Sequence, residues 1–309
     1  MLKTIIFCLS DVLYDHNGGM EFYRRICAES ERMRGICRPI VKQLRISKET
    51  WNRTVIEEID KETIRLAETE KAQILFLTDI PYFYHRVEPY HLAVLPIALT
   101  YEHLDAFPNA RYLLAGLEDV DLSYLNHVYE RYHHIPWRIF ETERTIVREM
   151  TEEDVEALYQ IYADPKNTRY IEPLFDDPEE ERAYIRQYID SIYHLLEFGL
   201  WIVEDREKAG TIIGRIGLSL REGFDDPELG YIVRTEFQKK GYATEVCRKI
   251  ISYAQREFSY KTLRILMDKD NEASHKLAAK LGFSYDKMVE VNQKQWQQYV
   301  LPLKKEDGE

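Results

Sequence analysis

The segment from Glu228 to Glu257 constrains this sequence most, because it joins a strand to a helix through a short polar turn. Leu229–Val233 is apolar and predicts a buried strand. The helix predicted to begin near Gly241 carries one apolar face, formed by Val246, Ile250, Tyr253 and Ala254. A helix start offers unpaired amides and a partial positive charge, and small residues at Gly241 and Ala243 leave the backbone open. The turn therefore predicts a site for a diphosphate.

The front of the chain alternates short apolar runs with amphipathic stretches. The stretch from Met20 to Lys71 has helical periodicity, with Ile56, Ile59, Thr63 and Leu66 on one side. Alternating strands and helices predict a parallel, Rossmann-like sheet. No dinucleotide-binding or P-loop glycine motif follows a strand here, so neither of those functions is supported. The predicted strands are Thr4–Leu9, Gln73–Thr78, His91–Ile97 and Arg111–Leu114.

A helix over Leu122–Tyr132 is followed by Pro136 and a polar stretch, which predicts a boundary between domains at residues 1–140 and 141–309. In the second domain Thr151 and Asp154 form a capping-box pattern. Another helix is expected to begin at Asp177-Pro178 and to end at Gly199. The strands expected here are Thr145–Arg148, Leu200–Glu204, Thr211–Ser219, Leu229–Val233 and Thr262–Met267.

Composition excludes several classes of function. The 309 residues carry a net charge of −12, which disfavours nucleic acid as a partner and suits a cationic one. The chain has no apolar run near the ~18 residues of a membrane span, and its acidic start does not resemble a signal peptide, so we expect a cytoplasmic protein. The cysteines lack ligand spacing, which predicts reduced thiols and no metal site. They are Cys8, Cys27, Cys37 and Cys247.

Beyond the strand at Thr262–Met267, Asn271 and Ser274 open a second helix that ends in Leu281-Gly282-Phe283. The order strand, Q-x-x-G-x-A, helix, strand, N-x-x-S, helix, L-G-F resembles the GNAT superfamily of N-acetyltransferases over roughly Glu141 to Phe283. It looks most like the branch that acetylates ribosomal-protein N-termini. The resemblance implies an α+β domain with a mixed, splayed central sheet, acetyl-CoA as co-substrate and no metal.

The resemblance also implies the parts of a cofactor site. The backbone amide of Tyr231 would polarise the thioester carbonyl, Ile232 and Val233 would contact the cofactor, and the backbone of Val233 would pair with the pantetheine arm. Asn271 would bind the same arm, and Gln238 opens the motif. The backbone amides expected to hold the diphosphate belong to Lys239, Lys240, Gly241, Tyr242, Ala243 and Thr244.

For catalysis, Glu228 is the candidate general base, and the alternative is a solvated carboxylate at a strand end. Many family members use a tyrosine as general acid, but Ala278 stands at that position here. Ser274 is the candidate substitute, with a plain helix-start serine as the alternative. The residues expected to line an amine pocket are Tyr170, Glu172, Phe175 and Trp201.

The front domain weakly resembles a degenerate haloacid dehalogenase-like (HAD-like) domain. Cys8 and Ser10 stand where that family has its two aspartates, which disfavours a phosphatase. Thr78 matches the phosphate-binding residue and Glu118-Asp119 the acidic pair, and Cys8 is open as a replacement nucleophile. A catalytically inactive domain for recognition or dimerisation is the preferred interpretation.

Three functions follow in order. The first is an N-acetyltransferase that moves an acetyl group from acetyl-CoA to a primary amine, either a peptide N-terminus or a small molecule such as an aminoglycoside or a polyamine. The second is a non-catalytic protein that senses acetyl-CoA, and the third is a phosphatase that uses the front domain. No nucleic acid or membrane is expected as a partner, and a homodimer is left open. The sequence identifies neither the acceptor amine nor the oligomeric state.

Overall fold

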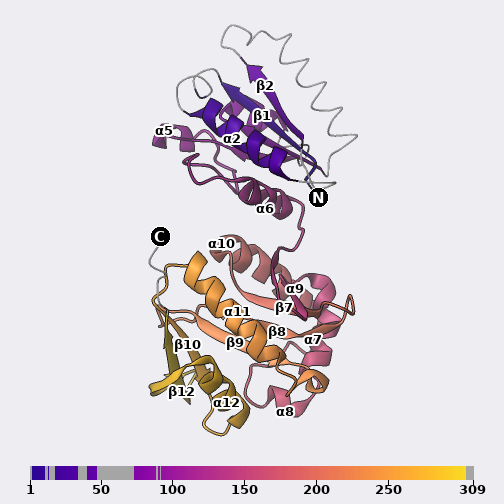
Figure 1. Cartoon of the computed structure of the whole chain (residues 1–309), viewed down its shortest axis with the longest axis vertical. Coiled ribbons are helices and arrows are strands. Elements are labelled where there is room, and N and C mark those ends of the chain that lie inside the picture. The colour runs from indigo at the N-terminus through magenta and orange to yellow at the C-terminus, as the bar shows by residue number, and fades with distance from the viewer. Residues whose placement is uncertain are drawn as a thin grey trace. The chain divides into compact units, whose positions relative to one another are not determined.

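A computed structural model describes most of the chain, and Figure 1 shows its course. The predicted helical face at Ile56, Ile59, Thr63 and Leu66 lies outside the described residues. The chain divides into two compact units, residues 1–135 and 136–309. The described residues are 2–10, 13, 18–33, 40–46, 73–87, 90 and 92–303.

The first unit is built on a parallel sheet with the strand order β2-β1-β3-β4. Alternate residues of β1 enter two separate cores: Phe7 packs with α2 and α6 on one face, and Cys8 packs with α4 on the other. Burial on both faces explains why these strands are continuous apolar runs. The strands are β1 (Thr4–Ser10), β2 (Ile40–Ile46), β3 (Ile74–Thr78) and β4 (Ala93–Pro96). The helices are α2 (Gly19–Arg32), α4 (Pro81–Val87), α5 (Tyr101–Leu104) and α6 (Leu122–Tyr132).

The parallel sheet was predicted, but two of its elements were not placed correctly. β2 lies within the stretch predicted to be helical, and it pairs along its whole length with β1. Arg111–Leu114 is not a strand, because Leu114 alone forms an isolated bridge, with Ile97. The Rossmann-like and HAD-like character of this unit remains a prediction.

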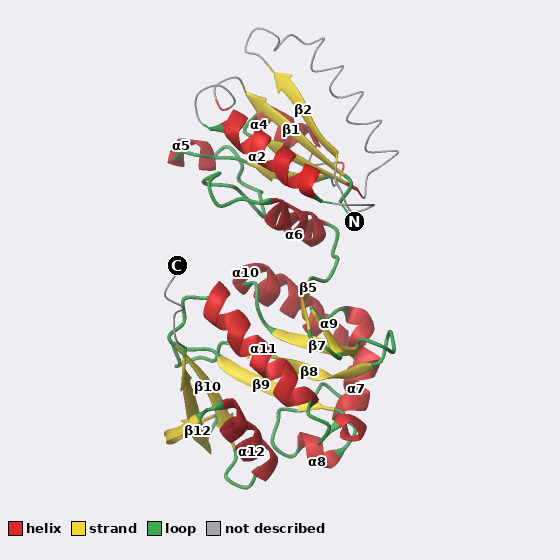
Figure 2. Cartoon of the chain, in the orientation of Figure 1, coloured by secondary structure: helices red, strands yellow, loops and turns green. Residues whose placement is uncertain are grey.

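The second unit contains an eight-stranded sheet in the order β11-β12-β10-β9-β8-β7-β6-β5, which is drawn in yellow in Figure 2. Among the described strands of this sheet, β9 and β10 are the one parallel pair, so the sheet is mixed, as predicted. β5 belongs to this sheet through its pairing with β6, although the predicted boundary left most of it in the front domain. The strands that precede the parallel crossover are β5 (Arg138–Glu141), β6 (Thr145–Arg148), β7 (Leu200–Asp205), β8 (Ile212–Ser219) and β9 (Glu228–Val233). Those that follow it are β10 (Thr262–Met267), β11 (Ser284–Val291) and β12 (Lys294–Pro302).

Helices cover both faces of this sheet. Figure 1 shows α11 crossing in front of β8 and β9, and α12 follows β10. A second group of helices connects β6 to β7 and packs on the other face, where Tyr162 and Tyr188 surround Arg215 of β8. The helices are α7 (Val155–Tyr162), α8 (Pro165–Thr168), α9 (Pro178–Tyr188), α10 (His194–Leu196), α11 (Tyr242–Glu257) and α12 (Glu272–Leu281).

The predicted helix starts are present, but one helix end is not where we expected it. The Thr151–Asp154 capping box forms, and Asp177 accepts a hydrogen bond from the Glu179 amide at the start of α9. Gly199 does not end the helix, because Glu197 adopts the left-handed conformation at φ 58° instead. This position requires glycine for a different reason, because a Cβ atom there would lie 2.4 Å from the Tyr193 ring.

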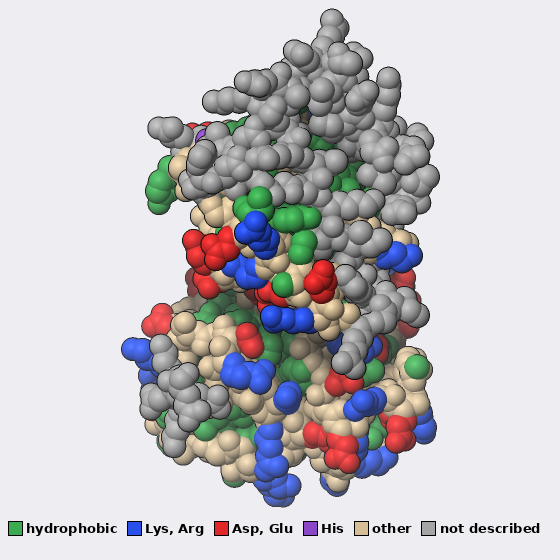
Figure 3. Space-filling model, turned by 45° about the horizontal axis from the view of Figure 1, so that its top comes forward, with side chains coloured by type: hydrophobic (Ala, Val, Ile, Leu, Met, Phe, Trp, Pro, Cys, Tyr) green, Lys and Arg blue, Asp and Glu red, His purple; other side chains and the backbone are tan. Residues whose placement is uncertain are grey.

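The β11–β12 hairpin was not predicted. Asn292 and Gln293 join its strands with φ of 51° and 62°, the backbone of a two-residue hairpin turn. Most residues of β11 are exposed, so the hairpin has no apolar run to reveal it. Figure 3 shows acidic and basic side chains interspersed on the face it draws, so the excess acid forms no continuous patch there.

Candidate active site

The sheet of the second unit opens between β9 and β10. These strands pair at a single position, Arg264 with Glu228, where the Arg264 amide donates to the Pro227 carbonyl at 3.0 Å. On their other edges, β10 pairs with β12 and β9 pairs with β8, each through six positions. Beyond Leu229, the edge of β9 that faces β10 is therefore unpaired in the described sheet.

The register of β8 and β9 decides which backbone groups of β9 face the opening. The Arg234 amide donates to the Ile213 carbonyl at 2.9 Å, and hydrogen-bonded pairs alternate along an antiparallel ladder. The backbone groups of Gly230 and Ile232 therefore point toward β8. Those of Tyr231 and Val233 point into the opening. The Tyr231 amide is thus directed where the sequence predicted it, whereas any contact of Ile232 with a ligand would come from its side chain.

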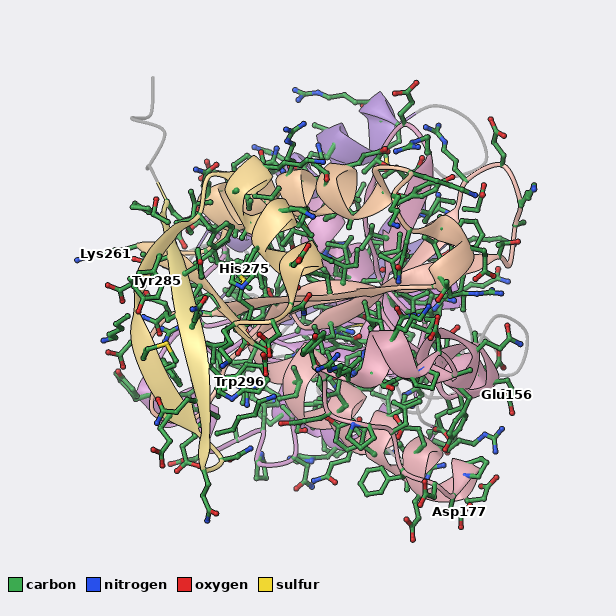
Figure 4. The ribbon with its side chains drawn as sticks, turned by 90° about the horizontal axis from the view of Figure 1, so that it is seen from below. Glu156, Asp177, Lys261, His275, Tyr285 and Trp296 are labelled. Carbon is green, nitrogen blue, oxygen red and sulfur yellow. The ribbon has the colours of Figure 1, made fainter. Side chains whose placement is uncertain are left out.

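A cavity of about 720 Å³ occupies this opening. Its floor comes from β8 and β9, one wall from the segment Arg169–Phe175 with α9, and another from the β11–β12 hairpin. Figure 4 shows Trp296 on that hairpin and Asp177 at the start of α9, on different sides of the unit. Predicted residues that line the cavity are Tyr170, Glu172, Phe175, Glu228, Tyr231, Ile232, Asn271 and Ser274. Arg215, Lys294 and Trp296 also line it and were not predicted.

Glu228 is a buried carboxylate at the start of β9. Its side chain is 13% exposed and accepts a hydrogen bond from Arg221 Nε at 2.9 Å. Burial raises its pKa above the ordinary glutamate value, and Arg221 opposes the rise. A carboxyl group with a raised pKa at a cavity wall suits the role of a general base.

Tyr231 and Ser274 meet on the α11–α12 side of the cavity. The Tyr231 hydroxyl is buried and has no hydrogen-bond partner among the described residues. Burial raises its pKa, and the neighbouring Ser274 opposes the rise, so the phenol is neutral at ordinary pH. Ser274 is 9% exposed and lines the cavity. Ala278 has no ionisable group and is fully buried in the core, so this position offers no general acid.

The start of α11 is an uncapped helix N-terminus. Gly241 has φ 88°, and no side chain accepts a hydrogen bond there, whereas Asn271 caps α12 by accepting from the Ser274 amide at 3.1 Å. Lys239 also has positive φ, at 59°. The first-turn amides of this 16-residue helix are therefore available to bind an anion. A shallower hollow beside it is lined by basic residues from three segments, Arg144, Arg248 and Lys280.

Gln238 and Asn167 hold the end of β9 in place. Gln238 Nε2 donates to the Val233 carbonyl at 2.9 Å and to Asn167 Oδ1 at 2.6 Å. Thr235 donates to Asp164 at 2.6 Å in the same loop. The Gln238 side chain therefore supports the loop that precedes α11. The Val233 carbonyl already accepts the hydrogen bond from Gln238. The predicted contact with the pantetheine arm therefore remains a prediction for the Val233 amide.

Trp201 does not line the cavity, although the sequence placed it there. It is fully buried in the core, where its ring packs edge-to-face with Tyr253 at 5.8 Å. Residues on a central strand alternate between the faces of a sheet, and Trp201 lies on the face covered by α11. The tryptophan that lines the cavity is Trp296.

The candidate residues of the first unit lie at one edge of its sheet. Cys8 and Thr78 are register partners, and Ser10 donates from its amide to Asp79 Oδ1 at 2.7 Å. Both Cys8 and Thr78 are fully buried. Burial raises the pKa of the Cys8 thiol, which favours the protonated form over the nucleophilic thiolate. Glu118 accepts from the Leu117 amide at 3.0 Å.

Within the part of the chain that the structure describes, no three histidine, cysteine or acidic side chains gather as a metal site would require. No helix in that part is long and apolar enough to cross a membrane.

Comparisons with known proteins agree with this geometry. The family model for the acetyltransferase (GNAT) domain matches residues 144–284. The uncharacterized N-acetyltransferase YoaA of Bacillus subtilis is 30% identical over 146 residues, which cover 47% of this chain and 82% of that protein. Through its second unit the chain belongs to the GNAT acetyltransferase family.

Two further proteins resemble the second unit. The spermidine N(1)-acetyltransferase of Escherichia coli is 28% identical over 142 residues, which cover 45% of this chain and 73% of that protein. The ribosomal-protein-S5-alanine acetyltransferase structure from Vibrio fischeri is 20% identical, with a TM-score of 0.44, over 54% of this chain and 97% of that one.

Proposed function

We propose that this protein transfers the acetyl group of acetyl-CoA to a primary amine. The observation that carries the proposal is the opening between β9 and β10, with the Tyr231 amide directed into it and the uncapped start of α11 beside it. Membership of the GNAT family implies acetyl-CoA as the acetyl donor. The site has groups suited to bind the diphosphate, the pantetheine arm and the thioester of that molecule.

The cofactor fits the residues present. The amides from Lys239 to Thr244 would hold the diphosphate at the start of α11, because they have positive electrostatic character and lack a side-chain cap. Arg144 and Arg248, in the hollow next to this turn, would add positive charge, although Glu245 already pairs with Arg144 at 2.6 Å. The pantetheine arm would follow the free edge of β9 toward Asn271.

The chemistry is acyl transfer. The amine nitrogen attacks the thioester carbonyl carbon, the carbon–nitrogen bond forms, and the carbon–sulfur bond breaks. The Tyr231 amide stabilises the charge that develops on the carbonyl oxygen. Glu228 accepts the proton that the amine loses, directly or through water. The departing thiolate takes a proton from Ser274, which lines the cavity, or leaves as the anion.

The first unit is proposed to be a non-catalytic α/β domain. Its phosphatase alternative loses support because Cys8 and Thr78 are both buried away from solvent. A sensor that binds acetyl-CoA without turnover is the second candidate, and the core position of Ala278 favours it. Amine-dependent release of CoA distinguishes the two, because a sensor releases none.

Trp201 and Trp296 of the second unit are expected to respond differently to truncation. Trp201→Ala leaves a cavity in the core and should destabilise the protein by about 3–5 kcal/mol, or roughly 10 °C in Tm. Trp296→Ala removes a half-buried cavity wall and should cost about 1 kcal/mol while raising the KM for the amine. Thermal melts and steady-state kinetics check both. A raised amine KM in a well-folded Trp201→Ala protein would contradict the assignment.

A further inference from the structure

Arg215 is a buried cation in the middle of an apolar strand. It lies on β8 and is 6% exposed, and its Nε atom has no hydrogen-bond partner among the described residues. No described carboxylate lies within ion-pair distance of it. Arg148, also largely buried, differs because it pairs with Asp154 at 2.7 Å and with Glu204 at 2.6 Å. Burying a charge without a partner costs several kcal/mol, so the missing partner of Arg215 requires an explanation.

Aromatic rings surround the guanidinium in place of carboxylates. Its Cζ lies 5.7 Å from the centre of the Tyr188 ring, which stabilises a cation through the ring face. Tyr184 and Tyr193 pack on the Tyr188 ring, with ring centres 6.0 Å and 5.2 Å away. Tyr188 is fixed in turn, because its hydroxyl accepts from the Leu200 amide at 2.9 Å. Arg215 is therefore held in one place by rings that leave its donors unused.

Arg215 lines the same cavity as the candidate base. Tyr162 and Tyr184 line it as well, so the guanidinium and its rings form one end of the chamber. In the β8–β9 ladder Arg215 is opposite Ile232, and Ser219 is opposite Glu228, four residues further along. Residues at even spacing share a face, and four residues span about 14 Å. The positive charge and Glu228 thus stand on one face, with the paired Gly217 and Gly230 between them.

Two other cations that line the cavity are paired with carboxylates. Arg221 pairs with Glu228 at 2.9 Å and with Glu172 at 3.7 Å, and Lys294 pairs with Asp268 at 3.1 Å. Glu181 also lines the cavity as a buried carboxylate; one of its oxygens accepts a hydrogen bond from the Phe175 amide at 3.1 Å, and Oε1 has no partner among the described residues. Among the described cations that line the cavity, Arg215 is the one that is buried, and it has no carboxylate within ion-pair distance. An anion that enters this cavity finds its counter-charge at Arg215.

We propose that Arg215 binds a carboxylate of the acceptor, so that the substrate is a primary amine that also carries a carboxylate group. This inference rests on the proposed acetyl transfer, because it concerns the amine in that reaction. The carboxylate would complete the buried cation at one end of the cavity, and the amine would lie toward Glu228. The same charge repels a polyamine, which would set this protein apart from its spermidine-acetylating relative.

The test compares matched amines that differ in the carboxylate alone. ω-Amino acids of increasing length are each paired with the alkylamine of the same length, and spermidine is added as a polycation. Binding to the full chain saturated with CoA is measured by calorimetry, which needs no turnover, and CoA release from acetyl-CoA is measured in parallel. Within one length class, the amino acid should bind roughly tenfold to a hundredfold more tightly than the alkylamine.

The variants Arg215→Gln and Arg215→Lys locate the effect. Arg215→Gln should abolish the preference by weakening amino-acid binding alone, with affinity for acetyl-CoA unchanged, and Arg215→Lys should retain part of it. A purely structural arginine would instead lower Tm and weaken both amines together. Equal binding of the pair by the wild type, a preference that survives Arg215→Gln, or tighter binding of spermidine would overturn the inference. Absent CoA release with the preference intact would sink the proposed acetyl transfer and leave the carboxylate site standing.

Discussion

Gly241→Val is expected to weaken acetyl-CoA binding by about 100-fold. The glycine adopts φ 88° at the start of α11, and the diphosphate would lie against the bare backbone there. A branched side chain blocks that approach. Losing two hydrogen bonds to a charged group at about 1.5 kcal/mol each corresponds to this factor. Calorimetric titration of acetyl-CoA into the full chain measures the effect.

Gly210→Val is the matched control for backbone strain. Gly210 has φ 79° in the β7–β8 loop, with no atom within 4 Å of the place where its Cβ would lie. Both substitutions carry a similar conformational cost of about 1–2 kcal/mol, but only Gly241 is near the proposed diphosphate site. If both variants lost acetyl-CoA affinity equally, strain would explain the result and the α11 site would be wrong.

Glu228→Gln is expected to lower kcat/KM by about 100-fold, the smaller end of the range for removing a general base. A carboxylate accepts a proton only when ionised, so wild-type activity should fall as pH falls through the pKa of Glu228. Because burial raises that pKa, the acid limb should lie at a higher pH than an ordinary glutamate would give. The glutamine can still accept a hydrogen bond from Arg221, so the variant should fold. Rates measured across the acid range in wild type and variant check this.

Glu172→Gln controls for the loss of a negative charge beside Arg221. Glu172 is the other carboxylate on Arg221, at 3.7 Å, and its side chain is 79% exposed. This variant should keep the acid limb, whereas Glu228→Gln should remove it. An unchanged limb in Glu228→Gln would show that another group accepts the proton.

Local sequence signals predicted several regular elements of both units well. Leu122–Tyr132, Thr145–Arg148 and Thr262–Met267 have the bounds expected from periodicity, and Asn271 caps α12. The mixed sheet and the GNAT family are confirmed. Helix and strand bounds depend on residues close together in the chain, and the family is recognised from the spacing of motifs along one segment. The sequence therefore reveals both.

The rest depends on contacts between distant segments. The β11–β12 hairpin brings Trp296 to the cavity, but its exposed, polar strands carry no apolar pattern. Trp201 was assigned to the cavity because a sequence does not show which face of a sheet a strand residue occupies. One signal for Arg215 was present in the sequence: a single charge inside the apolar run from Ile212 to Leu218. Its lack of a partner became evident only from the packed structure.

Amine-dependent transfer of the acetyl group tests the central claim most directly. The full chain is incubated with acetyl-CoA and the panel of ω-amino acids, alkylamines and spermidine, and both free CoA and acetylated amine are quantified. The account predicts that at least one primary amine is acetylated in equal amount to the CoA released, and that release stops without an amine. Tight acetyl-CoA binding with no product from any amine would contradict it and identify the protein as a sensor.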